Sequence, residues 1–241
     1  MSSSGHLALL PSLLGWRYAS LPGDSRKSFE VALHAGSAPV LAAVALRAGR
    51  RAGESLDPAA LALALLPPVA AGLAFEGPIE RRLGGMRSVG LAQVAAGAAL
   101  ALADGRPQRR DKSNAGDDLA VGLGQAIALV PGVSRSGAAL TAARLRGLSR
   151  PASLRLALTA AVPVTLGAAA LKGMRVARTG ADPQLLAPAL AGAGAAFVSA
   201  AAASPLVARL ERARSWAPLA AYRIGLGTLA LAAAGRARPL E

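Results

Sequence analysis

The stretch LVPGVSRSGAAL, residues 129–140, places one arginine, Arg135, inside an otherwise apolar run. A proline–glycine pair begins at Pro131, and Gly137 follows the arginine closely. Proline removes a backbone donor and glycine favours turns, so the surrounding segment 118–147 is predicted to form a helix, a tight turn and a second helix. The rest of the chain must explain why a permanently charged guanidinium stands there.

The whole chain is as apolar as this segment. Of its 241 residues, 53% are hydrophobic, and the mean hydropathy is +0.42. Arginine clusters separate the long uncharged stretches, which are 31–46, 58–75, 88–103, 119–134, 156–171, 183–208 and, broken only by Arg223, 215–235. A bilayer-spanning helix needs roughly 20 mainly apolar residues, and flanking arginines can extend their heads to the interface. A soluble amphipathic helix would carry charges on one face. A polytopic membrane protein is therefore favoured over an alanine-rich soluble bundle.

Six membrane-spanning helices are predicted, near 28–48, 58–76, 86–104, 152–174, 183–208 and 216–235. Residues 5–15 are too short to span a bilayer, and 118–147 is interrupted. Irregular backbone at membrane depth is tolerated only where it is buried in protein or lines a cavity, which fits a re-entrant hairpin. The predicted fold class is an all-α polytopic membrane protein with six transmembrane helices and re-entrant helical hairpins. Residues 1–241 are expected to form a single integral membrane domain.

The chain also contains an internal repeat. SSSGHLALLPSLLG (2–15) aligns without gaps on SRSGAALTAARLRG (134–147), with five identities that include SxSG at the start of each copy. Three predicted spans separate the copies, so the second copy enters from the opposite face. This predicts an inverted-topology repeat, 1–104 followed by 118–235, with a shared site near the midplane where broken helices meet.

The net charge of +14 limits the classes of partner. Such a balance is typical of proteins that bind nucleic acid, an anionic membrane surface or a phosphorylated ligand. Aromatic residues make up only 3%, so base-stacking platforms are scarce and no nucleic-acid partner is expected. The chain has no cysteine, which excludes a disulfide scaffold and a thiolate metal site or nucleophile.

Arg135 is the first candidate functional residue, because a charged side chain at mid-bilayer is costly and marks a functional site by default. One interpretation is a structural clamp that pairs with a carboxylate or with carbonyls. The other is an anion site, in which Ser134 and Ser136 supply hydroxyls and the Gly137 amide opens a short helix. Helix N-terminal amides, hydroxyls and an arginine suit a phosphate group. The second interpretation is favoured.

The matching tip of the first copy holds Ser3 and His6. Histidine can act as a general base near neutral pH, and a serine beside it can be an activated nucleophile. The alternative for a histidine at this position is simple solvation. Because His6 directly follows the repeated SxSG, a functional role is predicted.

Two further groups remain open. Glu30 heads an uncharged segment, with His34 one turn later on the same face. This pair either orients a substrate or a metal-bound water, or Glu30 merely complements the helix dipole. Arg223, inside the last predicted span, is either a second anion contact or an interfacial anchor, and the anchor is favoured. No paired carboxylates lie within an apolar segment, so no metal site is assigned.

These motifs resemble the undecaprenyl-diphosphate phosphatases of the BacA/UppP type. GQAIALVPGVSRSGAAL (124–140) resembles that family's PGxSRSG hairpin, and SSSGHLALLPSLLGW (2–16) its SSxGHL tip. FEVALHAGS (29–37) and PLAAYRIGLG (218–227) resemble a helix start and the last span of the family. The similarity runs over nearly the whole chain.

The resemblance implies a multi-pass hydrolase of the bacterial plasma membrane that removes one phosphate from undecaprenyl diphosphate, recycles the lipid carrier for cell-wall synthesis and confers bacitracin resistance. It implies a divalent cation, Mg²⁺ or Ca²⁺, and a possible homodimer. Arg135 would hold the diphosphate, while Ser3 and His6 would act at the reacting phosphorus. The substrate-binding residues would be Ser2, Ser4, Gly5, Glu30, Ser134, Ser136 and Gly137.

Some features depart from the family. Its first hairpin carries EGxTEFLP, with two glutamates linked to metal binding and catalysis, and that stretch does not precede SSSGHL here. Either the true start lies upstream, with Met1 at a position where the family often has valine, or the product is truncated and inactive; the first is favoured. His34 replaces a usual glutamine. A polyprenyl-phosphate transporter and an inactive lipid-phosphate binder are the alternative functions.

Overall fold

The computed structural model describes residues 3–53, 57–179 and 183–236, and its named elements there are all helical. They are α1 (Ser3–Leu14), the short 3₁₀ helix η1 (Arg17–Ser20), α2 (Gly23–Arg51), α3 (Pro58–Leu83), α4 (Met86–Asp104), α5 (Ala115–Ile127), α6 (Arg135–Leu145), α7 (Arg150–Thr179), α8 (Pro183–Glu211) and α9 (Ala217–Arg236).

Six of these helices are long and apolar enough to cross a membrane. The candidate spans are Ser25–Arg50, Pro58–Ile79, Met86–Asp104, Arg150–Leu171, Leu186–Glu211 and Ala217–Gly235, which confirms the six predicted spans. Large apolar side chains point outward from them, as with Leu73 and Leu102, each 75% exposed. A soluble bundle would bury such faces, so this exterior favours a hydrocarbon environment.

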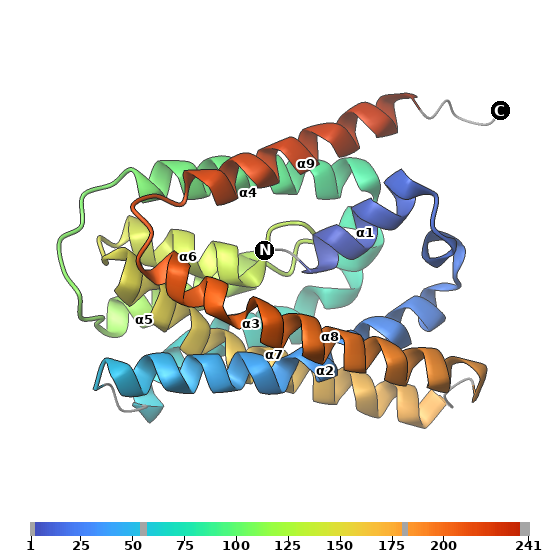
Figure 1. Ribbon diagram of the computed structural model, residues 1–241, viewed down its shortest axis with the longest axis horizontal. Helices are drawn as coiled ribbons and strands as arrows, with labels where there is room; N and C mark the ends of the chain where they lie inside the picture. The colour runs from blue at the N-terminus through green and yellow to red at the C-terminus, as the bar shows by residue number, and fades with distance from the viewer. Residues whose placement is uncertain (1–2, 54–56, 180–182, 237–241) are drawn as a thin grey trace.

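The helices form two outer layers with shorter helices between them (Figure 1). Helices α4 and α9 lie side by side along one edge, while α2, α7 and α8 form the other, and α3 runs between these layers against α5. Between them, α1 reaches the middle of the molecule from one end and the α5–α6 hairpin from the other. This placement agrees with two opposed re-entrant elements, and the division into repeats 1–104 and 118–235 stays a prediction.

Small residues allow the long helices to approach closely. A Cβ added at Gly36 of α2 would lie 2.1 Å from the backbone oxygen of Ala193 in α8. Across the other layer, a Cβ at Gly227 of α9 would lie 2.6 Å from the backbone oxygen of Gly90 in α4. Close backbone contact through small residues is the usual way that helices pack in membranes. These contacts fix the two layers that enclose the middle helices.

The predicted helix–turn–helix within 118–147 is confirmed as α5 and α6. Helix α5 begins with a capping box: the Asn114 side chain accepts from the Asp117 amide, and the Asp117 carboxylate accepts from the Asn114 amide. Asp117 is fully buried and also pairs with Arg110 and Arg146. The capping box satisfies the backbone amides of Asn114 and Asp117. The two ion pairs hold the loop before α5 against the end of α6.

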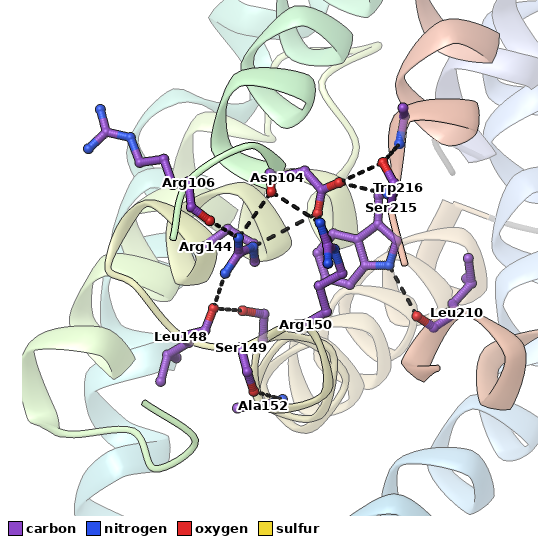
Figure 2. A network of polar contacts seen from close by, with 12 residues as sticks. Asp104, Arg106, Arg144, Leu148, Ser149, Arg150, Ala152, Leu210, Ser215 and Trp216 are labelled. Carbon is purple, nitrogen blue, oxygen red and sulfur yellow. Dashed lines mark hydrogen bonds and ion pairs between the residues drawn. The ribbon is translucent and has the colours of Figure 1, made fainter. Parts of the chain in front are cut away.

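A second polar network joins the ends of four helices, α4, α6, α7 and α9 (Figure 2). The carboxylate of Asp104, at the end of α4, accepts hydrogen bonds from Arg150 of α7 and from Ser215 and Trp216 beside α9. Fully buried Arg144 donates to the carbonyl oxygens of Asp104, Arg106 and Leu148. Several arginines expected at the lipid surface therefore fasten helix ends instead, because the carbonyls freed there need donors.

Candidate functional site

The tip of the hairpin is held in an unusual backbone conformation. Ser134, the N-cap of α6, has a φ of 70°, a left-handed value that is rare outside glycine. Its Oγ accepts a hydrogen bond from the Gly137 amide at 3.2 Å and lies 3.4 Å from the Ser136 Oγ. Such strain clusters at functional sites and persists where the surroundings enforce it.

Two details differ from the sequence-based expectation. Helix α6 begins at Arg135 and not at Gly137, so the Gly137 amide is the third of the helix and is already bonded to the Ser134 hydroxyl. The reason is the serine side chain, which occupies the N-cap position. Gly137 still has a steric function, because a Cβ there would lie 2.4 Å from Nη1 of Arg223.

Arg223 is buried and not an interfacial anchor, so the prediction that favoured an anchor was wrong. Its side chain is 2% exposed and donates to the carbonyl oxygens of Gly132 at 2.9 Å and Val133 at 2.6 Å. It also donates to Oε1 of Gln93 in α4 at 3.0 Å. These tip carbonyls lack helical partners, and unpaired polar backbone is costly at membrane depth. Arg223 is the structural clamp of the hairpin tip.

Arg135 has a different environment. Its half-buried side chain lines a small cavity of about 40 Å³, together with Glu30 and His34 of α2 and Thr165 of α7. Within the described residues it makes no hydrogen bond and no ion pair within 4 Å, and Glu76 of α3 acts on it only through its charge. A guanidinium without protein acceptors beside a cavity is suited to an anionic ligand.

Ser3 faces the same group of residues from α1. Its Oγ lies 3.2 Å from Nε2 of His34, and Nδ1 of His34 lies 2.7 Å from the backbone oxygen of Glu30. A carbonyl oxygen can only accept, so Nδ1 carries the proton, and Nε2 of the neutral ring is the acceptor for the Ser3 hydroxyl. A hydroxyl, an imidazole and an arginine from three helices thus meet at one place.

The Glu30 carboxylate is held by a residue that the sequence analysis did not identify. The hydroxyl of Tyr18, in η1, donates to Oε1 of Glu30 at 3.0 Å. Burial, followed by the negative charge of Glu30, raises the pKa of Tyr18 above its ordinary value, which keeps its proton in place. No periodicity connects Tyr18 to α2, since the contact depends on how the chain turns at η1.

The structure pairs Ser3 with His34 rather than with His6. Nε2 of His6 lies 2.8 Å from the Tyr222 hydroxyl, and the two rings stack with centroids 5.7 Å apart. Serine and histidine three residues apart on one helix share a face, but here α2 and α9 supply the nearer partners. The predicted action of His6 at the phosphorus stays a prediction.

Four other predicted site residues remain, and the structure describes them only in part. Gly5 is buried in α1, and Ser136 is half-buried in the first turn of α6. Ser2 and the side chain of Ser4 lie outside the part of the chain that the structure describes. Thr165, at the cavity, and Glu76, whose charge acts on Arg135, were missed because neither belongs to a recognisable motif.

The described residues do not fit a protein-built site for the expected cation. Within residues 3–53, 57–179 and 183–236, no group of three His, Cys, Asp or Glu side chains converges. Mg²⁺ and Ca²⁺ take six or more mostly oxygen ligands, whereas the Arg135 cavity offers one carboxylate and one imidazole. No step is assigned to a cation here.

A larger cavity of about 710 Å³ lies between α2, α3 and α7. Most of its lining is apolar, and its polar residues include Asp57, Asp111 and Asp118. Asp118 is 4% exposed, and its Oδ1 has no hydrogen-bond partner among the described residues. Burial, followed by the charges of Asp117 and Asp57, raises the pKa of Asp118 to about 6.

Comparison with known proteins agrees with the motifs. The family model described as "Bacitracin resistance protein BacA" matches residues 1–229. The "Undecaprenyl-diphosphatase" of Geobacter sulfurreducens is 35% identical, over 96% of this chain and 91% of its own. The "Undecaprenyl-diphosphatase 1" of Rhodospirillum rubrum is 35% identical, over 97% and 89%, and the "Undecaprenyl-diphosphatase" of Dinoroseobacter shibae is 37% identical, over 96% and 91%. The chain, a multi-pass membrane protein with a convergent serine, histidine and arginine, belongs to the bacitracin resistance protein BacA family.

Proposed function

We propose that this protein is an undecaprenyl-diphosphatase of the bacterial plasma membrane. It hydrolyses undecaprenyl diphosphate to undecaprenyl phosphate and phosphate, returns the lipid carrier to cell-wall synthesis and thereby confers bacitracin resistance. The observation that carries this proposal is Arg135, whose guanidinium lines a cavity and has no acceptor among the described residues, while the Ser3–His34 pair lies beside it. The relatives named undecaprenyl-diphosphatase support a polyprenyl diphosphate as the class of substrate.

The chemistry follows from the residues at the two tips. Arg135 can bind two phosphoryl oxygens in parallel, which orients the terminal phosphate and stabilises charge that builds up in the transition state. Ser3, exposed at the start of α1, presents its hydroxyl to that phosphate. Arg223 binds no substrate in this scheme; it holds the carbonyls of the tip, so that Arg135 stays in place.

The test is phosphate release from undecaprenyl diphosphate by the purified protein in detergent, with Mg²⁺, with Ca²⁺ and with a chelator. The 241 residues are compared with the same chain extended upstream in frame. The expected result is phosphate release by either form, abolished by Arg135→Met. Release that needs an added cation would support the Mg²⁺ or Ca²⁺ requirement that the family resemblance implies. No release by either form, with or without cation, would overturn the proposal.

Phosphate release also distinguishes the enzyme from the two alternative functions. A polyprenyl-phosphate transporter would move lipid headgroups across vesicles without releasing phosphate, and an inactive binder would bind the lipid and do neither.

We also propose a homodimer, as the family resemblance implies. Native mass spectrometry in detergent would find dimers if that is correct and monomers alone if it is not.

A further inference from the structure

We propose that His34 accepts the proton of the Ser3 hydroxyl when that oxygen attacks the terminal phosphate. The inference rests on the proposed function and deepens it, because it assigns a proton acceptor to the serine. It derives from one set of contacts: Ser3 Oγ to His34 Nε2 at 3.2 Å, and His34 Nδ1 to the Glu30 carbonyl at 2.7 Å.

These contacts have the order that an activated serine requires. A nucleophile lies within hydrogen-bond reach of a base, and a third group orients the base. Here the orienting group is a backbone carbonyl one helical turn before His34, so its position follows from the helix itself. The tautomer that results leaves Nε2 unprotonated and directed at the hydroxyl.

The side chains around the His34 imidazole come from several helices. Arg135 faces His34 across the cavity from α6, and Thr165 faces it from α7. Glu30, on the same helix, accepts from Tyr18. Helix α8 brings no charge to this part of α2, where Gly192 packs against Phe29 and Leu33. Arg135 and Glu30 are thus the charged residues that line this cavity together with His34.

The reaction balances with these groups and water. In the first step a bond forms between Ser3 Oγ and the terminal phosphorus, the bond from that phosphorus to the bridging oxygen breaks, and its electron pair leaves with the lipid phosphate. The serine proton then resides on Nε2 of His34. In the second step water attacks the phosphoserine, the imidazolium returns its proton to Oγ, and the water oxygen leaves with both its protons as dihydrogen phosphate.

The decisive variants are His34→Gln and His34→Ala. Glutamine can still accept a hydrogen bond from Ser3 but cannot take up its proton, whereas alanine removes both functions. Because general-base catalysis contributes typically 10²- to 10⁴-fold, both variants should lose about 100-fold or more in kcat, with little change in KM. The fall in rate towards acid pH that reports imidazole protonation should also disappear from kcat/KM in His34→Gln.

A double variant tests whether His34 acts through Ser3. If it does, Ser3→Ala combined with His34→Gln should be no slower than Ser3→Ala alone, because groups that act as one unit are not additive. Ser37→Ala is the matched control on α2, since that hydroxyl bonds only to carbonyls of its own helix. It should keep the wild-type rate and pH profile.

The outcomes separate the two proposals. If the wild type releases phosphate and His34→Gln keeps its kcat and its acid limb, the role of His34 is wrong and the phosphatase function stands. A double variant much slower than Ser3→Ala would also contradict the proposed role of His34. If the wild type releases no phosphate, the proposed function fails and the inference fails with it.

Discussion

Two arginines near the same hairpin tip differ in what holds them. Arg223 donates to three acceptors and is buried, whereas Arg135 lines a cavity and has no acceptor within the described residues. Both are charged residues in apolar segments, and the sequence favoured an interfacial anchor for Arg223, so it did not identify the clamp. Their contacts make Arg223 a structural residue, whereas the cavity beside Arg135 supports its proposed role in ligand binding.

Replacing each arginine by methionine should separate these roles. Arg135→Met should lower phosphate release about 100-fold or more, since electrostatic groups at the reacting centre contribute at least that much, and should leave the thermal midpoint unchanged within about 2 °C. Arg223→Met leaves buried carbonyls unpaired, at about 1–3 kcal/mol each, and should lower the midpoint clearly. Thermal unfolding in detergent together with the phosphate assay measures both. Equal destabilisation by the two variants would contradict the assignment.

Asp118 should make the stability depend on pH. In the folded protein the pKa of Asp118 is raised to about 6, whereas an aspartate in the unfolded chain titrates near pH 4. The folded state therefore binds the proton of Asp118 more tightly than the unfolded chain does. Its contribution to stability is therefore highest below about pH 4 and is lost as the pH rises through 6. Asp118→Asn should match the wild type near pH 4 and exceed it by roughly 3 kcal/mol above pH 7. A constant difference at all pH values, measured by thermal unfolding, would refute this.

At the scale of elements, helix packing depends on where glycines lie along a helix. Gly227 of α9 touches α4, and an added Cβ there would lie 2.6 Å from the Gly90 oxygen. Gly225, on the same helix, has no atom within 4 Å of such a Cβ. The two glycines differ only in the direction in which they face.

The matched pair Gly227→Val and Gly225→Val tests this contact. Gly227→Val must push α4 and α9 apart, and we expect a loss of 1–3 kcal/mol or more, the usual cost of overpacking. Gly225→Val should change stability by less than about 0.5 kcal/mol. Thermal midpoints in one detergent compare them directly, and similar midpoints for both variants would contradict the packing.

At the scale of the whole molecule, six crossings decide which segments share a face. The residues before α2 lie on one side, and three crossings place the loop after α4 on the other. Arg150 begins α7 and Trp216 directly precedes α9 on that second side, where both bond to Asp104. The network in Figure 2 is therefore consistent with the span count.

Single cysteines can verify this topology, because the chain contains none. Ser20→Cys precedes α2, and Lys112→Cys follows α4; both positions are exposed. A membrane-impermeant maleimide should label them from opposite sides of sealed vesicles. Labelling of both from the same side would mean that one of the three intervening helices does not cross.

The sequence by itself determined the spans, the broken hairpin, the family resemblance and the candidate residues at both tips. Each of these depends on local features: the length of an apolar run, a proline–glycine pair, or a motif within one segment. Only the tertiary structure decided that Ser3 bonds to His34, that His6 bonds to Tyr222 and that Arg223 clamps the tip. Those partners lie 31, 216 and 91 residues apart in the chain. Side chains that far apart meet only through the packing of α1, α2, α6 and α9, which no local pattern specifies.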